Sequence, residues 1–126
     1  MMEKTLKYYE QGNPIRLIES SYENFKIDIL DAYGLPADLT GASAFFHLME
    51  FSTRNHIWSK ECAITYDSGG GYGDTGYPFT VTVVLDNSDT SGLEGHYTGQ
   101  LELTDHNAAS RFPFEIEIII KSKASV

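Results

Sequence analysis

Positive charge is scarce in this chain. Lys and Arg number 9 among the 126 residues, against 18 Asp and Glu, so the formal net charge is −9. Proteins that bind nucleic acid do so largely by neutralising phosphates with basic side chains, so the composition argues against nucleic acid as the main partner. It argues against an anionic membrane surface for the same reason. We therefore expect partners of another kind.

Cysteine is almost absent. Cys62 is the single cysteine, so no intrachain disulfide can form and the fold must rest on packing. Cys62 lies in an alternating stretch and is best interpreted as a small buried hydrophobe, with a reactive thiol as the alternative.

Long hydrophobic runs are also lacking. No segment approaches the ~18 apolar residues of a membrane span, and the first residues have no signal-peptide pattern. We expect a cytosolic protein, unless it leaves the cell in a particle.

Motifs for catalysis or metal binding are also lacking. No HExxH, CxxC or GxSxG pattern occurs. The prediction is a protein that is not an enzyme and that has no metal and no cofactor. A calcium site remains a weaker alternative, because turn chemistry alone explains Asp, Asn and Ser in the loops that would supply it. The four histidines are His47, His56, His96 and His106, and the candidate calcium ligands are Asp67, Asp74, Asp86 and Asp89.

Alternation of apolar and polar residues dominates what is present, and it predicts strands. No stretch shows a sustained helical period. The expected fold is all-β: an antiparallel two-sheet sandwich, immunoglobulin-like, with about seven to eight strands. Residues 1–13 are expected to form an N-terminal arm and residues 14–126 a single domain. The expected strands cover residues 15–18, 25–29, 44–51, 58–66, 79–85, 97–104 and 112–120.

One segment gives more specific information on the fold than the composition does. It runs from Asp31 through Gly34 and Pro36 and then reads Asp-Leu-Thr-Gly-Ala from Asp38, with Tyr33 and Leu35 as variable positions. Asp38 is placed to cap its own turn, Leu39 to plug the end of the core, and Gly41 to bend the backbone. These roles hold the fold together and do not by themselves make a binding site.

With its flanking strands, this segment resembles the immunoglobulin-like N-terminal domains of tailed-phage structural proteins, including upper-baseplate proteins. The later segments Leu93–Tyr97 and Leu101–Asp105 and the final apolar strand resemble the same family. The resemblance implies a virion structural protein of the baseplate, tail or neck, assembled in the host cytoplasm. It implies other phage structural proteins as partners and a homo-oligomer in the particle. The family's longer members continue into a helical or receptor-binding part, which is expected here to be missing or to be another protein.

Candidate contact residues are tyrosines on the expected arm and on a glycine-rich loop. A carbohydrate-binding module for host-surface recognition is the alternative function, with Trp58 joining the loop tyrosines as a stacking platform. A third possibility is a bacterial domain of unknown role. The candidate contact residues are Tyr8, Tyr9, Tyr72 and Tyr77.

The acidic stretch from residue 61 to 110, which has no Lys or Arg, is interpreted as a solvated surface, with charge pairing between copies as the alternative.

Overall fold

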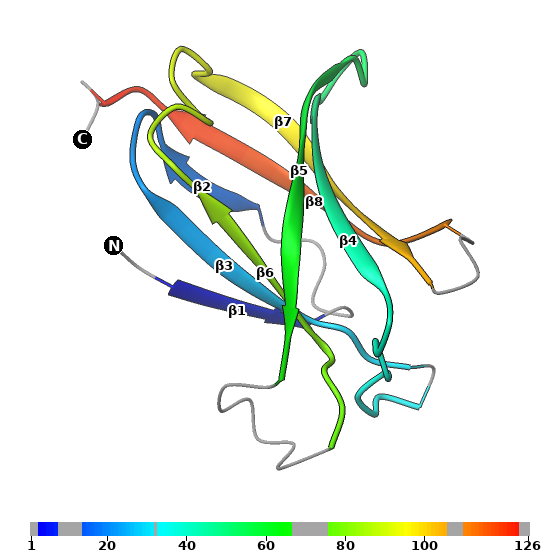
Figure 1. Cartoon of the computed structure of the whole chain (residues 1–126). Helices are drawn as coiled ribbons and strands as arrows, with labels where there is room; N and C mark the ends of the chain where they lie inside the picture. The colour runs from blue at the N-terminus through cyan, green and yellow to red at the C-terminus, as the bar shows by residue number, and fades with distance from the viewer. Residues whose placement is uncertain (1–2, 8–13, 32, 67–75, 106–109, 124–126) are drawn as a thin grey trace.

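Eight strands make up most of the described chain in the computed structural model, which describes residues 3–31, 33–66, 76–105 and 110–123 apart from 8–13 (Figure 1). The prediction of an all-β fold is confirmed. The strands are β1 (Glu3–Lys7), β2 (Ile15–Ile18), β3 (Glu23–Asp28), β4 (Ser43–Glu50), β5 (His56–Thr65), β6 (Thr80–Leu85), β7 (Gly95–Thr104) and β8 (Ser110–Lys121).

The period-two pattern places one face of each strand in a common core. In β4, Ala44, Phe46 and Leu48 are at most 2% exposed, while the residues between them are less buried. In β3, Phe25 meets Phe46 edge to face, with ring centroids 5.4 Å apart. Such aromatic pairs add to the free energy gained by burying apolar surface. The core is therefore continuous between strands that lie far apart in the sequence.

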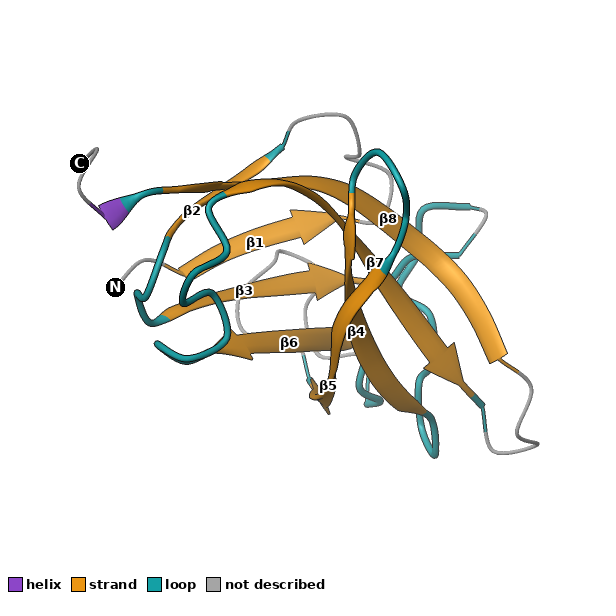
Figure 2. Cartoon of the chain, turned by 90° about the horizontal axis from the view of Figure 1, so that it is seen from above, coloured by secondary structure: helices purple, strands orange, loops and turns teal. Residues whose placement is uncertain are grey.

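The strands form one mixed, nearly closed sheet in the order β1-β3-β6-β5-β4-β7-β8-β2 (Figures 1 and 2). Strand β5 joins its two halves, because residues 58–62 pair with β4 and residues 63–65 pair with β6. The expected division into two separate sheets is therefore not what the strand order shows. A long strand that serves both halves produces a barrel-like wall around the core.

The expectation of purely antiparallel pairing is wrong at both ends of the sheet. Strand β1 runs parallel to β3, and β2 runs parallel to β8. The pairings between them in the sheet order are antiparallel. Part of the expected N-terminal arm, residues 3–7, is strand β1 of the sheet. Hydrophobic alternation predicts a strand but not the direction of its neighbour, which is why the sequence pattern missed these pairings.

The turn before β4 forms as its sequence indicates. The Asp38 carboxylate accepts hydrogen bonds from the Thr40 backbone N–H at 3.0 Å and the Thr40 hydroxyl at 2.6 Å. These bonds lower the pKa of Asp38. Leu39 is 9% exposed and belongs to the core cluster, and Gly41 has φ +80°. The predicted roles of Asp38, Leu39 and Gly41 are confirmed.

Candidate interaction surfaces

The tyrosines proposed as contact residues fall into two groups. Tyr8, Tyr9 and Tyr72 lie outside the described residues. Tyr77 is half-buried, and its hydroxyl donates a hydrogen bond to the Pro36 carbonyl oxygen at 2.9 Å. Tyr77 therefore braces the base of the loop that contains Pro36, and its hydroxyl is already engaged within the fold.

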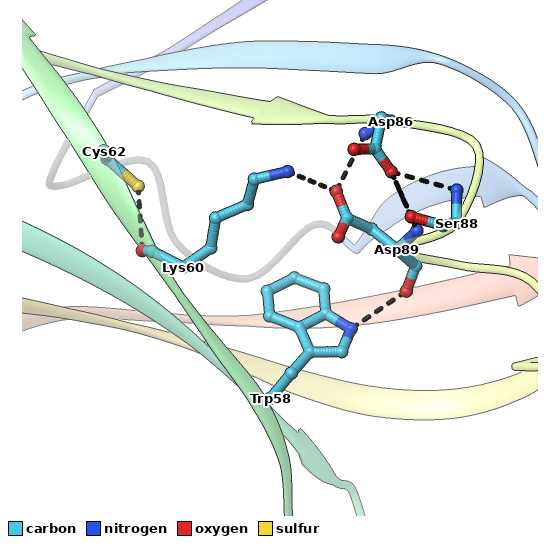
Figure 3. Close-up of polar contacts among 6 residues, drawn as sticks. All are labelled: Trp58, Lys60, Cys62, Asp86, Ser88 and Asp89. Atoms are coloured by element: carbon cyan, nitrogen blue, oxygen red, sulfur yellow. Dashed lines mark hydrogen bonds and ion pairs between the residues drawn. The ribbon is translucent and has the colours of Figure 1, made fainter.

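Trp58 also makes a structural contact (Figure 3). Its indole N–H donates to the Asp89 carbonyl oxygen at 2.9 Å, and the half-buried side chain packs against the core. From the same strand, the Lys60 ammonium forms an ion pair with the Asp89 carboxylate. Trp58 and Lys60 together fasten the β6–β7 loop to β5. We call this contact of Trp58 and Lys60 with residues 86–89 the loop clasp.

A single carboxylate organises the loop side of the clasp. Asp86 Oδ1 accepts the backbone N–H groups of Ser88 at 2.9 Å and Asp89 at 3.2 Å, and the Ser88 hydroxyl at 2.6 Å. The Ser88 hydrogen bonds are the main cause that lowers the pKa of Asp86. Asp89 in turn accepts the Asp86 backbone N–H at 2.8 Å. Turn chemistry thus accounts for Asp86 and Asp89, and no group of three metal-ligating side chains occurs among the described residues.

Cys62 lies on the inner face of β5. It is 9% exposed, and its thiol donates to the Lys60 carbonyl oxygen at 3.5 Å. Burial raises the pKa of Cys62 to about 11. The prediction of a small buried hydrophobe is confirmed, and the thiolate that a reactive cysteine needs is disfavoured.

Polar groups from three strands meet on the outer face of the sheet. His47 on β4 lies 2.8 Å from the Glu102 carboxylate on β7 through Nε2, and 2.6 Å from the Ser59 hydroxyl on β5 through Nδ1. The Nε2 atom of His56 lies 2.6 Å from the same hydroxyl. Since an ionised carboxylate can only accept, the chain of donors that fits runs from His56 through Ser59 and His47 to Glu102. Sequence spacing gave no sign of this cluster, because only strand register brings its members together.

This order of serine, histidine and carboxylate is also the order found in activated nucleophiles. Catalysis of acyl transfer further requires amide donors for the developing oxyanion, which turns and helix starts commonly supply. Ser59 instead lies inside β5, where it is paired in register with His47. The contacts of the cluster join β4, β5 and β7 across this face.

The β4–β5 hairpin folds over the neighbouring part of this face. Arg54 makes two hydrogen bonds to the Glu115 carboxylate on β8, at 3.0 and 2.9 Å, which lower the pKa of Glu115. Phe51 stacks on His96 of β7 with ring centroids 3.9 Å apart, and His96 contacts Glu117. The hairpin is thus tied to both β7 and β8, and this part of the outer face is engaged within the chain.

A different surface lies at the loop that follows β3. Asp31 Oδ1 accepts the backbone N–H groups of Tyr33 at 2.8 Å and Leu35 at 3.0 Å. The Asp31 N–H donates to the Leu35 carbonyl at 2.7 Å, and the Gly34 N–H donates to the Asp31 carbonyl at 3.0 Å. Gly34 has φ +78°, which glycine adopts at little cost. We call residues 33–36, closed by Asp31, the tip.

The tip presents large apolar side chains to solvent. Tyr33 is 89% exposed and Leu35 is 59% exposed. The residues that anchor the loop are buried, with Ile29 at 5% and Leu30 at 4%, and Leu30 forms a β-bridge with Pro36. From the sequence, Tyr33 and Leu35 were recognisable only as variable positions of their segment. Their exposure could not be read from the sequence, because an apolar residue beside Gly and Pro fits a buried corner equally well.

A membrane-spanning helix is not found in the described part of the chain, where no helix has the length and apolar character that a span requires.

Comparisons with known proteins give a similarity in fold to a solved structure. No protein-family model matches the chain, and no curated protein matches it. Among solved structures, the N-terminal domain of phage TP901-1 ORF48 superimposes with a TM-score of 0.60 at 15% sequence identity, covering 95% of this chain and 99% of that one. The similarity spans both chains almost completely, so this chain shares the fold of that phage protein's N-terminal domain.

Proposed function

We propose that this chain is a phage virion structural protein that acts as a non-catalytic attachment or connector module between proteins. The observation that carries the proposal is the similarity in fold to the N-terminal domain of phage TP901-1 ORF48, which extends over almost the whole of both chains. The net charge of −9 fits a protein whose partners are neither nucleic acid nor membrane. A station in the baseplate, tail or neck and a relation to the immunoglobulin-like architecture belong to the same proposal.

The sheet offers a physical route to attachment. Strands β1 and β2 are the two ends of the strand order, so the sheet is nearly closed but still has terminal strands. A terminal strand can pair with a strand of another chain, and a symmetric particle repeats such a contact between copies. A homo-oligomer in the particle and contacts with other phage structural proteins both follow from this proposal.

The carbohydrate-binding alternative receives less support. A stacking platform needs an aromatic face open to a sugar. Trp58 is half-buried and bonded to Asp89, and Tyr77 is half-buried and bonded to Pro36. Two of the three aromatic side chains that were expected to form the platform thus serve the fold.

The direct test is the presence of the chain in purified particles. Particles from a lysate of the phage or prophage that encodes it are banded in a density gradient, and the chain is quantified by mass spectrometry against the major capsid protein. The proposal predicts a fixed number of copies per particle that survives a high-salt wash. Absence from banded particles, with the chain found only in the soluble lysate, would contradict it.

Solution mass measured by light scattering adds a second test of the same proposal. Measurement at two protein and two salt concentrations distinguishes a closed oligomer from a monomer. A closed ring or trimer at all four conditions supports a repeated subunit contact. A monomer that also fails to enter particles would contradict the attachment role.

A further inference from the structure

The tip has an unusual combination of order and exposure. Its backbone is fixed by the two hydrogen bonds to Asp31 Oδ1, by the Asp31–Leu35 backbone bond and by the bridge at Pro36. Tyr77 adds a brace from another loop through its bond to the Pro36 carbonyl. Yet Tyr33, at 89%, is the most exposed large apolar residue among those described.

The exposed side chains are not needed to build this loop. Asp31 and Gly34 set the turn, and Tyr33 and Leu35 contribute their backbone N–H groups, which any residue except proline would supply. Solvated turns are ordinarily filled by Asn, Asp, Ser or Gly. An aromatic and a leucine side chain displayed on an ordered turn therefore have no explanation in the fold itself.

Order makes such side chains effective in binding. Ordering a loop when a partner binds costs free energy, and a loop that is already ordered avoids that cost. Aromatic side chains placed in a recess of the partner dominate the energetics of many interfaces. Tyrosine in particular combines a large contact area with few rotatable bonds. The tip thus has the properties of an interface anchor.

We infer that the tip docks Tyr33 and Leu35 into an apolar recess, rimmed by Lys or Arg, on another protein of the particle. This inference rests on the proposed function and names the surface that performs it. The basic rim follows from charge: Asp31 borders the tip, Asp38 lies two residues beyond Pro36, and both aspartates are exposed. A cationic rim is complementary to these carboxylates, whereas an acidic one would repel them.

The first experiment measures entry into particles of the double variant Tyr33→Ser, Leu35→Ser, supplied from a plasmid to a phage that lacks the gene. The matched control is Tyr22→Ser. Tyr22 is a 45% exposed tyrosine that precedes β3, whereas the tip follows β3, so the two lie at opposite ends of that strand (Figure 1). Both variants are first shown to have the unfolding midpoint of the wild-type chain. The inference predicts at least a tenfold loss of the tip variant from particles and normal entry of the control.

The outcomes separate the inference from the proposed function. Normal entry of the tip variant would overturn the inference while leaving the chain a virion protein. Absence of the wild-type chain from particles would overturn the proposed function and the inference with it. A loss that is equal for Tyr22→Ser and the tip variant would also overturn the inference, because it would show no preference for the tip.

The second experiment identifies the contact. A photoreactive benzoylphenylalanine at position 33 is irradiated in assembled particles, and the adduct is mapped by mass spectrometry. The inference predicts one adduct with a different virion protein, at apolar residues flanked by Lys or Arg. An adduct of twice the mass of this chain would overturn the inferred partner in favour of a second copy, and no adduct in particles that contain the chain would overturn the docking itself.

Discussion

Two loops of this molecule use the same turn chemistry and end in opposite states. In the tip, Asp31 Oδ1 accepts the backbone N–H groups of Tyr33 and Leu35, and in the loop clasp, Asp86 Oδ1 accepts those of Ser88 and Asp89. The loop of the clasp packs against the fold, because the Asp89 carboxylate pairs with Lys60 and the Asp89 carbonyl accepts the Trp58 indole N–H. The tip instead leaves Tyr33 and Leu35 exposed to solvent.

The comparison shows which residues set the backbone and which decide the use of a loop. The aspartate fixes the shape in both places. The residues that follow the aspartate decide whether the loop packs on the fold or stays available to a partner. After Asp86, Asp89 lies within reach of Lys60 and Trp58. After Asp31, Tyr33 and Leu35 lie in solvent. Stability should therefore depend on the contacts of the clasp and hardly at all on the side chains of the tip.

The largest effect is expected for Trp58→Ala. The change removes a half-buried aromatic side chain and leaves the Asp89 carbonyl without its indole partner. We expect a loss of about 3 kcal/mol in the free energy of unfolding, measured by urea denaturation. Trp58→Phe serves as the control, because it keeps most of the packing and should lose about 1 kcal/mol. Equal losses for the two variants would show that the hydrogen bond, and not the packing, stabilises the clasp.

A smaller effect is expected for Lys60→Met. This change keeps the length and apolar character of the side chain and removes the charge that faces Asp89, whose side chain is 19% exposed. We expect a loss of about 1–2 kcal/mol, because the ion pair is only partly shielded from water. Addition of 1 M NaCl should reduce the difference between wild type and variant. A variant as stable as the wild type would show that the loop needs no ion pair to stay closed.

The aspartates that shape the two loops should have moderate effects. Asp31→Ala is expected to cost about 1 kcal/mol, since two backbone N–H groups lose a carboxylate partner. Asp86→Ala should destabilise the fold in a pH-dependent way. The pKa of Asp86 is lowered in the fold, so its contribution is present above the ordinary value of 3.8 and is lost as the pH falls through the lowered value.

The measurement for Asp86 is thermal unfolding of wild type and Asp86→Ala between pH 7 and pH 2. The gap between the two midpoints should be constant near neutral pH and narrow in the acid range. A gap that stays constant down to pH 2 would contradict the assignment of the lowered pKa to the folded loop.

The smallest effect is expected at the tip itself. Tyr33→Ser and Leu35→Ser should each change the free energy of unfolding by less than about 0.5 kcal/mol, because both side chains are mostly in solvent and their backbone bonds remain. Urea denaturation, read by circular dichroism, provides the measurement. A loss above about 1 kcal/mol would mean that these side chains pack within the fold.

The sequence predicted seven of the eight strands, because burial leaves a direct period-two signature, as in Phe25 and Ile27 or Val81 and Val83. Strand β1 was missed, because residues 1–13 were expected to form an arm. The sequence did not predict the parallel neighbours of β1 and β2, since alternation carries no information on strand direction. The turn role of Asp38 was predictable because its partner, Thr40, is two residues away. The contacts of Trp58 with Asp89 and of Tyr77 with Pro36 join residues 31 and 41 positions apart, and no local pattern reveals them.

The tip shows the same limit from the other side. Its turn residues, Asp31, Gly34 and Pro36, were recognisable in the sequence, and the structure gives each a role in the turn. The exposure of Tyr33 depends on where the whole sheet places the end of β3. Local chemistry therefore predicted the shape of the loop, and only the assembled fold showed what the loop presents.

The most direct test of this account is the order of the tip in the free chain, measured by ¹⁵N NMR relaxation. If the tip is ordered, the Tyr33, Gly34 and Leu35 amides should have order parameters of about 0.85, the value typical of rigid backbone. The amides of β3 should have similar values. Values below about 0.6 at the tip amides, with β3 remaining rigid, would contradict the account, because the tip would then be a mobile loop without a preformed shape for a partner.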